Sequence, residues 1–256
     1  MSAYERNFVV TARDVDPQNR VRADAVAVML QESAAHHADA WGMSIPSLNR
    51  EGRTWVLARL AMEFGGRPGW KEELRVETWS RGFRGHVATR DYLVSAADGG
   101  VVARATSVWF VIDLATRRPV RLDEYGTRGA HDPDRTAGVD EPGKLAPPPQ
   151  GAAETFLKVR ASDLDLNGHV NNSRYIEWLY EAVPASVLQS RRMSRLELHF
   201  LAETHYPGDI LIRRAAEPGA ANGAANGAAS AEELGFVHSI LRPDGVEAVR
   251  ARSRWS

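Results

Sequence analysis

Cysteine is absent from the 256 residues of this chain, and lysine occurs only at Lys71, Lys144 and Lys158. Without cysteine there can be no disulfide bond, thiolate metal site or cysteine nucleophile. No apolar run approaches the roughly 18 residues of a membrane-spanning helix, and the first residues lack the pattern of a secretory signal. The net charge is −1, so overall charge does not favour nucleic acid as a partner. We expect a cytoplasmic protein with no membrane span.

Several motifs of known chemistry are also missing. The chain has no glycine-rich phosphate loop, no Gly-x-Ser-x-Gly turn and no dinucleotide fingerprint. Glu32, His36 and His37 have helical spacing, but a third ligand is missing and this helix face is typical of a core. We therefore expect neither a cofactor nor a metal. Apolar residues make up 43% of the chain, enough for one large domain or two smaller ones.

The chain contains an internal duplication. Residues 10–32 align without a gap with 159–181, and seven of 23 positions are identical, where chance would give roughly one or two. Residues 98–109 align with 244–255 at six of 12 positions, and Arg59-Leu60-x3-Phe64 recurs as Arg195-Leu196-x3-Phe200. Three matches in the same order indicate two copies of one ancestral unit rather than shared composition.

Both copies predict the same elements. A β-rich stretch (Glu5–Ala12 or Glu154–Ala161) precedes a helix with one apolar face, and Pro184 should end the second helix. Four strands follow in each copy, and Asp-Gly turns join the last two. The expected strands are 54–64, 73–81, 86–96 and 101–112, then 193–202, 209–216, 234–241 and 246–255. The fold class is therefore α+β, with an antiparallel sheet against the apolar face of a helix in each half.

The domain boundaries follow from composition. Residues 1–122 form the expected N-terminal domain, and residues 154–256 form the C-terminal one. Residues 123–153 are rich in proline and glycine and lack periodicity, which is typical of a linker. The low-complexity stretch 218–231 is expected to be a flexible hairpin loop within the second domain.

The two copies differ most just before the helix. Asp165, Asn167 and His169 place an acid, an amide and an imidazole together, where the first copy has Asp16, Gln18 and Arg20. Asn171 or Asn172 should cap the helix, whose N-terminus favours a developing oxyanion. Asn167 can donate a hydrogen bond, and His169 can exchange a proton near neutral pH. A polar capping loop without chemistry is the alternative interpretation.

This motif resembles that of a known family. The run Asp-Leu-Asp-Leu-Asn-Gly-His-Val-Asn-Asn-x-x-Tyr-Ile-x-Trp at 163–178 resembles the signature of plant and bacterial acyl-acyl carrier protein thioesterases. In the first copy, residues 30–34, 105–109 and 116–118 resemble the same family. The resemblance implies a tandem double hotdog fold, in which each half is a long helix wrapped by a curved antiparallel sheet.

The resemblance also implies roles for individual residues. Asp165, Asn167 and His169 fall on the family's catalytic Asp-x-Asn-x-His. Residues 196–204 resemble the strand that carries a catalytic glutamate followed by cysteine, so Glu203 falls on the glutamate and Thr204 on the cysteine. Thr204 excludes a cysteine–histidine nucleophile, which favours attack by water with Glu203 as base. How His169 and Glu203 divide proton transfer stays open.

The expected function is hydrolysis of fatty acyl-acyl carrier protein, with the acyl chain in an apolar channel of the first copy. An acyl-CoA thioesterase of the same fold and a non-catalytic acyl-binding module are the alternatives. Chain-length preference stays open, and either a monomer or a homodimer is reasonable. Two groups of arginines could meet an acidic carrier protein, although a solvated surface charge is the more usual role of any single arginine. The groups are Arg117, Arg118 and Arg121, and Arg191, Arg192 and Arg195.

Overall fold

A computed structural model describes residues 2–126, 128–217 and 233–256. The chain forms two compact units, unit 1 (Met1–Glu141) and unit 2 (Pro142–Ser256). The stretch 218–231, expected to be a flexible loop, lies outside the described residues.

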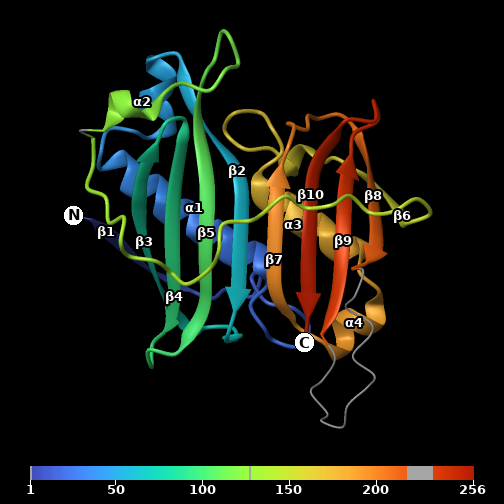
Figure 1. The fold of residues 1–256 in the computed structure, drawn as a ribbon. Helices are drawn as coiled ribbons and strands as arrows, with labels where there is room; N and C mark the ends of the chain where they lie inside the picture. Colours follow the sequence, from blue (N-terminus) through green and yellow to red (C-terminus); the bar gives the residue numbers. More distant parts are fainter. Residues whose placement is uncertain (1, 127, 218–232) are drawn as a thin grey trace. The chain divides into compact units, whose positions relative to one another are not determined.

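Unit 1 consists of a long helix against a five-stranded antiparallel sheet (Figure 1). The strands are ordered β1-β3-β4-β5-β2, and α1 packs on β1 and β3. Its elements are β1 (Ala3–Val9), α1 (Ala23–Asp39), α2 (Ile45–Arg50), β2 (Arg53–Phe64), β3 (Glu73–Arg84), β4 (Val87–Ala96), β5 (Val101–Asp113) and the 3-10 helix η1 (Leu122–Tyr125).

Unit 2 repeats this plan with shorter elements. The strands are ordered β6-β8-β9-β10-β7, which is the order of unit 1 with each strand replaced by its duplicate, and α3 packs on β6 and β8. Its elements are β6 (Ala153–Lys158), the 3-10 helix η2 (Ala161–Asp163), α3 (Asn172–Ala182), α4 (Ala185–Ser190), β7 (Met193–Phe200), β8 (Asp209–Ala216), β9 (Leu234–Leu241) and β10 (Glu247–Trp255). The predicted helix and antiparallel sheet are confirmed in both halves. The four strands after each helix do not form a simple meander, however, because β2 pairs with β5 and β7 with β10, the last strand of each unit.

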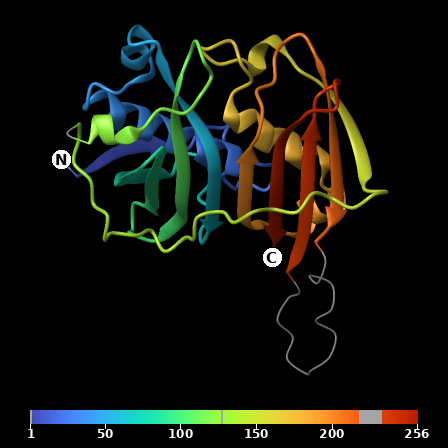
Figure 2. The ribbon, with the colours of Figure 1, turned by 45° about the horizontal axis from the view of Figure 1, so that its top comes forward.

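Helix burial follows the apolar spacing of the sequence. In α1, Val26, Met29 and Leu30 lie on the buried face, and in α3, Ile176 and Leu179 do so. Figure 2 shows both helices behind the strands of their own sheets. Helix α3 ends at Ala182, because Pro184 cannot continue it and instead precedes α4. The predicted end of the second helix is therefore confirmed.

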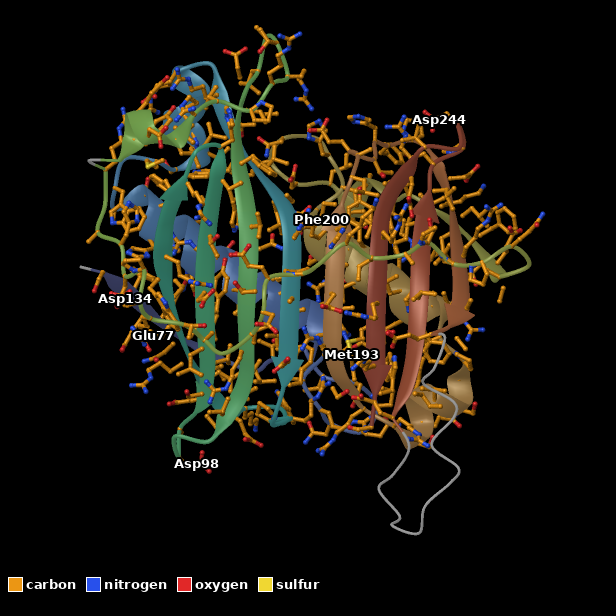
Figure 3. All side chains as sticks on the ribbon, viewed as in Figure 1. Glu77, Asp98, Asp134, Met193, Phe200 and Asp244 are labelled. Carbon is orange, nitrogen blue, oxygen red and sulfur yellow. The ribbon has the colours of Figure 1, made fainter. Side chains whose placement is uncertain are left out.

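The Asp-Gly turns lie where the duplication predicts them. Asp98 and Asp244 are at the tips of the β4–β5 and β9–β10 hairpins (Figure 3). Gly99 and Gly245 have φ values of 86° and 79°, in the left-handed region that glycine adopts without strain. Asp98 and Asp244 each accept a backbone N–H two residues on, at 2.8 and 3.1 Å. These side chains close the turns locally.

Residues 131–141 lie across the sheet of unit 1, on strands β3 and β4. The backbone N–H of Ala137 donates to the buried Asp91 at 2.8 Å, and Trp79 Nε1 donates to the carbonyl of Arg135 at 3.1 Å. Arg135 pairs with Glu77 of β3 at 2.7 Å. Part of the segment expected to be a linker is therefore packed on a sheet without regular secondary structure of its own.

Candidate active site

The loop between η2 and α3, which contains the predicted motif, is organised by Asp165. Its Oδ1 accepts the backbone N–H groups of Asn167 and His169 at 2.8 and 3.3 Å. The N–H of Asp165 donates to the carbonyl of His169 at 2.8 Å, and the N–H of Gly168 donates to the carbonyl of Asp165 at 3.1 Å. The Asp165 carboxylate thus fixes the loop through backbone contacts alone.

Unit 1 contains the same loop with different side chains. Asp16 Oδ1 accepts the N–H groups of Gln18 and Arg20, both at 2.9 Å. The N–H of Asp16 donates to the carbonyl of Arg20, and that of Asn19 to the carbonyl of Asp16. All four bonds match those of the unit 2 loop at a shift of 149 residues. The two loops therefore share one backbone arrangement, and they differ in their side chains.

A second segment, directly after β7, meets this loop. The backbone N–H of Val170 donates to the carbonyl of Thr204 at 3.0 Å. This bond brings the neighbouring side chains together: His169 Nδ1 lies 3.6 Å from Glu203 Oε1, and both side chains are about one third exposed, at 30% and 35%. The separation exceeds a hydrogen bond, but catalytic contacts are often long before substrate binds.

The equivalent place in unit 1 has no such pair. There the N–H of Val21 donates to the carbonyl of Pro68 at 2.9 Å, so Pro68 corresponds to Thr204 and Arg67 to Glu203. Arg20 stands where unit 2 has His169, and it pairs with Asp16 at 2.8 Å. Two cations thus stand where unit 2 has the imidazole and the carboxylate.

Asn167 lies at the exposed tip of the loop. Within the described residues no hydrogen bond of its side-chain amide is found, and its backbone is held by Asp165. Asn171 caps α3, with its side chain accepting the N–H of Ser173 at 2.9 Å. The N–H of Arg174 is paired with the carbonyl of Asn171. Two N–H groups of the first turn of α3 are therefore already bonded, whereas the Asn167 side chain is exposed.

Two further residues lie at this place, and neither was assigned a role from the sequence. The His205 ring meets the His169 ring edge to face, with the centroids 4.9 Å apart. Tyr175, on α3, is 3% exposed, and burial raises the pKa of its phenol, as does the charge of Glu203. The tyrosine of the motif was a signal for Tyr175, whereas nothing in the spacing pointed to His205.

The other candidate residues have partners of their own. Glu32 and His36 approach to only 4.0 Å, and His37 is buried against Arg90 at 3.0 Å. Arg195 is already paired with Glu197, and Arg121 with Asp123.

A pocket of unit 2 is bordered by α3 and β6. It is lined by Lys158, Asp163, Glu177, Glu181 and other residues, and such charged walls do not suit an apolar chain. Among the described helices, none is long and apolar enough to cross a membrane.

Two family models together match nearly the whole chain. The acyl-ACP thioesterase N-terminal domain matches residues 1–127, and the acyl-ACP thioesterase C-terminal domain matches residues 148–256. A curated palmitoyl-acyl carrier protein thioesterase of Gossypium hirsutum is 28% identical over 98% of this chain and 63% of its own length. An oleoyl-acyl carrier protein thioesterase of Arabidopsis thaliana is 27% identical over 99% of this chain and 76% of its own length. The chain thus spans about two thirds to three quarters of these relatives.

Solved structures match over both units. An acyl-ACP thioesterase of Bacteroides thetaiotaomicron is 25% identical with a TM-score of 0.84, covering 100% of this chain and 98% of that one. The 12:0-ACP thioesterase of Umbellularia californica is also 25% identical, with a TM-score of 0.83 over 99% of this chain and 94% of that one. The expected α+β tandem hotdog fold is confirmed.

Proposed function

Because this chain belongs to the acyl-ACP thioesterase family, we propose that it hydrolyses the thioester that joins a fatty acyl chain to acyl carrier protein. The products are the free fatty acid and the carrier protein with a free thiol. The observation that carries the proposal is the contact between His169 and Glu203 in unit 2, which unit 1 lacks although its loop has the same backbone bonds.

Glu203 is the base in this proposal. A water molecule attacks the thioester carbonyl carbon, and the Glu203 carboxylate accepts a proton from that water. The carboxylate is half-buried and within 3.6 Å of an imidazole that can hold or pass on the proton. Thr204 cannot supply a thiolate, so no acyl-enzyme through sulfur forms here.

Asn167 stabilises the oxyanion of the tetrahedral intermediate. Its amide is exposed at the tip of a loop whose backbone Asp165 holds, so the donor is placed before the reaction begins. The intermediate then collapses with cleavage of the C–S bond, and the leaving sulfur receives a proton from His169 or Glu203. Asp165 acts through the loop and not on the substrate.

We further propose a division of labour between the two units. Unit 1 has arginines in place of the imidazole and the carboxylate, so we assign it to binding of the acyl chain and unit 2 to the chemistry. The expected cytoplasmic location stays a prediction, since the curated plant relatives are named as chloroplastic. Acyl carrier protein is the proposed protein partner.

The test is a hydrolysis assay on the full chain. Purified protein is offered saturated acyl-acyl carrier protein thioesters of increasing chain length and the matching acyl-CoA thioesters, and free thiol is followed with a thiol-reactive dye. We expect thiol release from the carrier-protein substrates. A strong preference for acyl-CoA would contradict the assignment of the carrier protein. Tight acyl binding without thiol release would point to a binding module instead.

A further inference from the structure

Three metal-ligating side chains of unit 2 gather at the loop–strand junction. One ligand atom each from His169, Glu203 and His205 lies within 4.8 Å of the other two. Among residues 2–126, 128–217 and 233–256, no other group of three histidine or acidic side chains comes this close. The cluster includes the two groups of the proposed chemistry, but His205 has no part in that chemistry.

The donor set suits a divalent transition metal. Two imidazoles and one carboxylate are the protein ligands of many zinc sites, and a water completes the tetrahedron. Ligands 2.0–2.1 Å from a tetrahedral metal lie about 3.4 Å apart, so separations of up to 4.8 Å need to close by up to about 1.4 Å. Small rotations of side chains supply this movement, because His169 and Glu203 are about one third exposed and His205 is exposed. Imidazole nitrogen disfavours Mg²⁺, which prefers oxygen ligands.

The backbone beneath the three side chains is held in place. Val170 and Thr204 are joined by their backbone hydrogen bond, and Arg242 Nη1 donates to the carbonyl of Glu203 at 3.0 Å. The charge of Arg242 is itself paired with the carboxylate of Asp244. A metal ion bound by the three side chains therefore faces a guanidinium whose charge is already neutralised by Asp244.

Unit 1 offers an internal comparison. The backbone bonds that align Val21 with Val170 and Pro68 with Thr204 place Arg20, Arg67 and Gly69 where unit 2 has the three ligands. Two arginines and a glycine cannot bind a metal cation. Any metal site of this kind therefore belongs to unit 2 alone.

We propose that His169, Glu203 and His205 bind a divalent transition-metal ion such as Zn²⁺, and that the bound ion blocks hydrolysis. The binding half of this inference stands on the geometry alone, and the blocking half rests on the proposed function. A metal on the His169 nitrogen and the Glu203 oxygen occupies the lone pairs that would accept a proton. Hydrolysis then stops until a chelator removes the ion.

The first test measures binding without any substrate. Zn²⁺ is titrated into the metal-free full chain by calorimetry in a buffer that does not chelate, and Co²⁺ is added separately to follow its visible absorption. We expect one site per chain, abolished or weakened by His205→Ala. Loss of a direct ligand should cost at least the roughly 10- to 100-fold in affinity that loss of an outer-shell partner costs. His86→Ala is the matched control, because His86 is also exposed but lies in unit 1.

The second test measures hydrolysis. Zn²⁺ should inhibit the wild type and the His86→Ala variant at the concentrations at which it binds, and a chelator should restore the rate. Measured against its own metal-free rate, the His205→Ala variant should need at least about tenfold more Zn²⁺ for the same fractional inhibition. Mg²⁺ at equal concentration should have no effect.

The outcomes separate this inference from the proposed function. Equal Zn²⁺ affinity of the wild type and His205→Ala, or no binding to the wild type, overturns the metal site whatever the hydrolysis assay gives. Binding that depends on His205 in a chain without thioesterase activity supports the site and refutes the proposed function. Binding that depends on His205 but leaves the hydrolysis rate unchanged overturns the inhibitory half.

Discussion

The backbone N–H of Val170 donates to the carbonyl oxygen of Thr204 at 3.0 Å, and this bond joins the motif loop to the segment after β7. His169 and Glu203 each precede one of these residues, so the bond brings an imidazole and a carboxylate 3.6 Å apart from positions 34 residues apart in the chain. The same bond in unit 1, from Val21 to Pro68, brings two arginine positions together. The same backbone arrangement thus occurs in both units, and the two junctions differ in their side chains.

The first prediction concerns His169 and Glu203. His169→Ala and Glu203→Gln should each lower kcat/KM for an acyl-acyl carrier protein by at least about 100-fold, because each removes a group that moves a proton. Asn167→Ala should do the same by removing the oxyanion donor. Steady-state thiol release measures the effect, and near-UV circular dichroism checks the fold.

The matched control for this series is in unit 1. Arg20 occupies the place of His169 in the duplicate loop, so Arg20→Ala makes the same kind of truncation on an equivalent backbone. It should change kcat/KM by less than about tenfold. Equal losses in Arg20→Ala and His169→Ala would mean that both loops serve folding, and the assignment of chemistry to unit 2 would fail.

The second prediction separates the charge of Asp165 from its backbone contacts. Asp165→Asn keeps an Oδ1 that can accept the N–H groups of Asn167 and His169, so most of the turnover should remain. Asp165→Ala loses both bonds, and it should lower turnover at least about tenfold and the free energy of unfolding by roughly 1–2 kcal/mol. Kinetics and urea unfolding measure the two effects.

Asp16→Ala is the control for this prediction, because Asp16 holds the duplicate loop with equivalent bonds. It should cost similar stability without the same loss of turnover. If Asp165→Asn is as inactive as Asp165→Ala, the carboxylate charge itself takes part in the reaction and the positioning role is wrong.

Local pattern was sufficient to predict much of this fold. The strands β8 (Asp209–Ala216) and β9 (Leu234–Leu241) have the predicted bounds, because alternation and turn residues lie within each segment. The first strand ends at Val9 and not at Ala12 as predicted, because Thr11 and Asp14 form a local turn. The short helix α2 (Ile45–Arg50) was missed, since six residues are too few to show a helical period.

Only the site residues within the sequence motif or the family resemblance could be predicted. Asp165, Asn167 and His169 are close in sequence, and Glu203 was assigned through the family resemblance. His205 was missed because its meeting with His169 depends on a backbone bond across the junction, and no spacing along the chain encodes that contact. The contact of the buried Asp91 could not be predicted either. Its hydrogen-bond donor Ala137 lies in a segment without periodicity, so nothing in the sequence indicated that this segment packs on the sheet.

The third prediction concerns Thr204, which stands where the family resemblance places a cysteine. Thr204 is 3% exposed and lies against the buried Tyr175, so its hydroxyl is poorly placed to attack a substrate. Thr204→Ala should change turnover by less than about tenfold, well below the effect of losing a catalytic group. Thr204→Val, which keeps the volume and removes the hydroxyl, separates packing from polarity. A loss of 100-fold or more in Thr204→Val would assign the hydroxyl a role in the chemistry.

The fourth prediction concerns the pH dependence of folding at His238, on β9. Burial, together with the charge of Arg214, lowers the pKa of His238 to about 3, and its Nε2 lies 2.9 Å from Ser253 Oγ. The folded chain therefore keeps this ring neutral, whereas the unfolded chain binds a proton below the ordinary value of 6.5. Because the unfolded state binds more protons between these values, stability is full above 6.5 and is lost as the pH falls toward 3.

Urea unfolding at pH 7 and pH 5 measures this loss. Between these two pH values the wild type should lose about 2 kcal/mol more of its unfolding free energy than His238→Gln, whose side chain can still bond Ser253 but cannot titrate. His86→Gln, at an exposed histidine of unit 1, should behave like the wild type. Parallel pH dependence in the wild type and His238→Gln would show that His238 is protonated in the folded chain at pH 5. The prediction that the buried ring stays neutral would then be wrong.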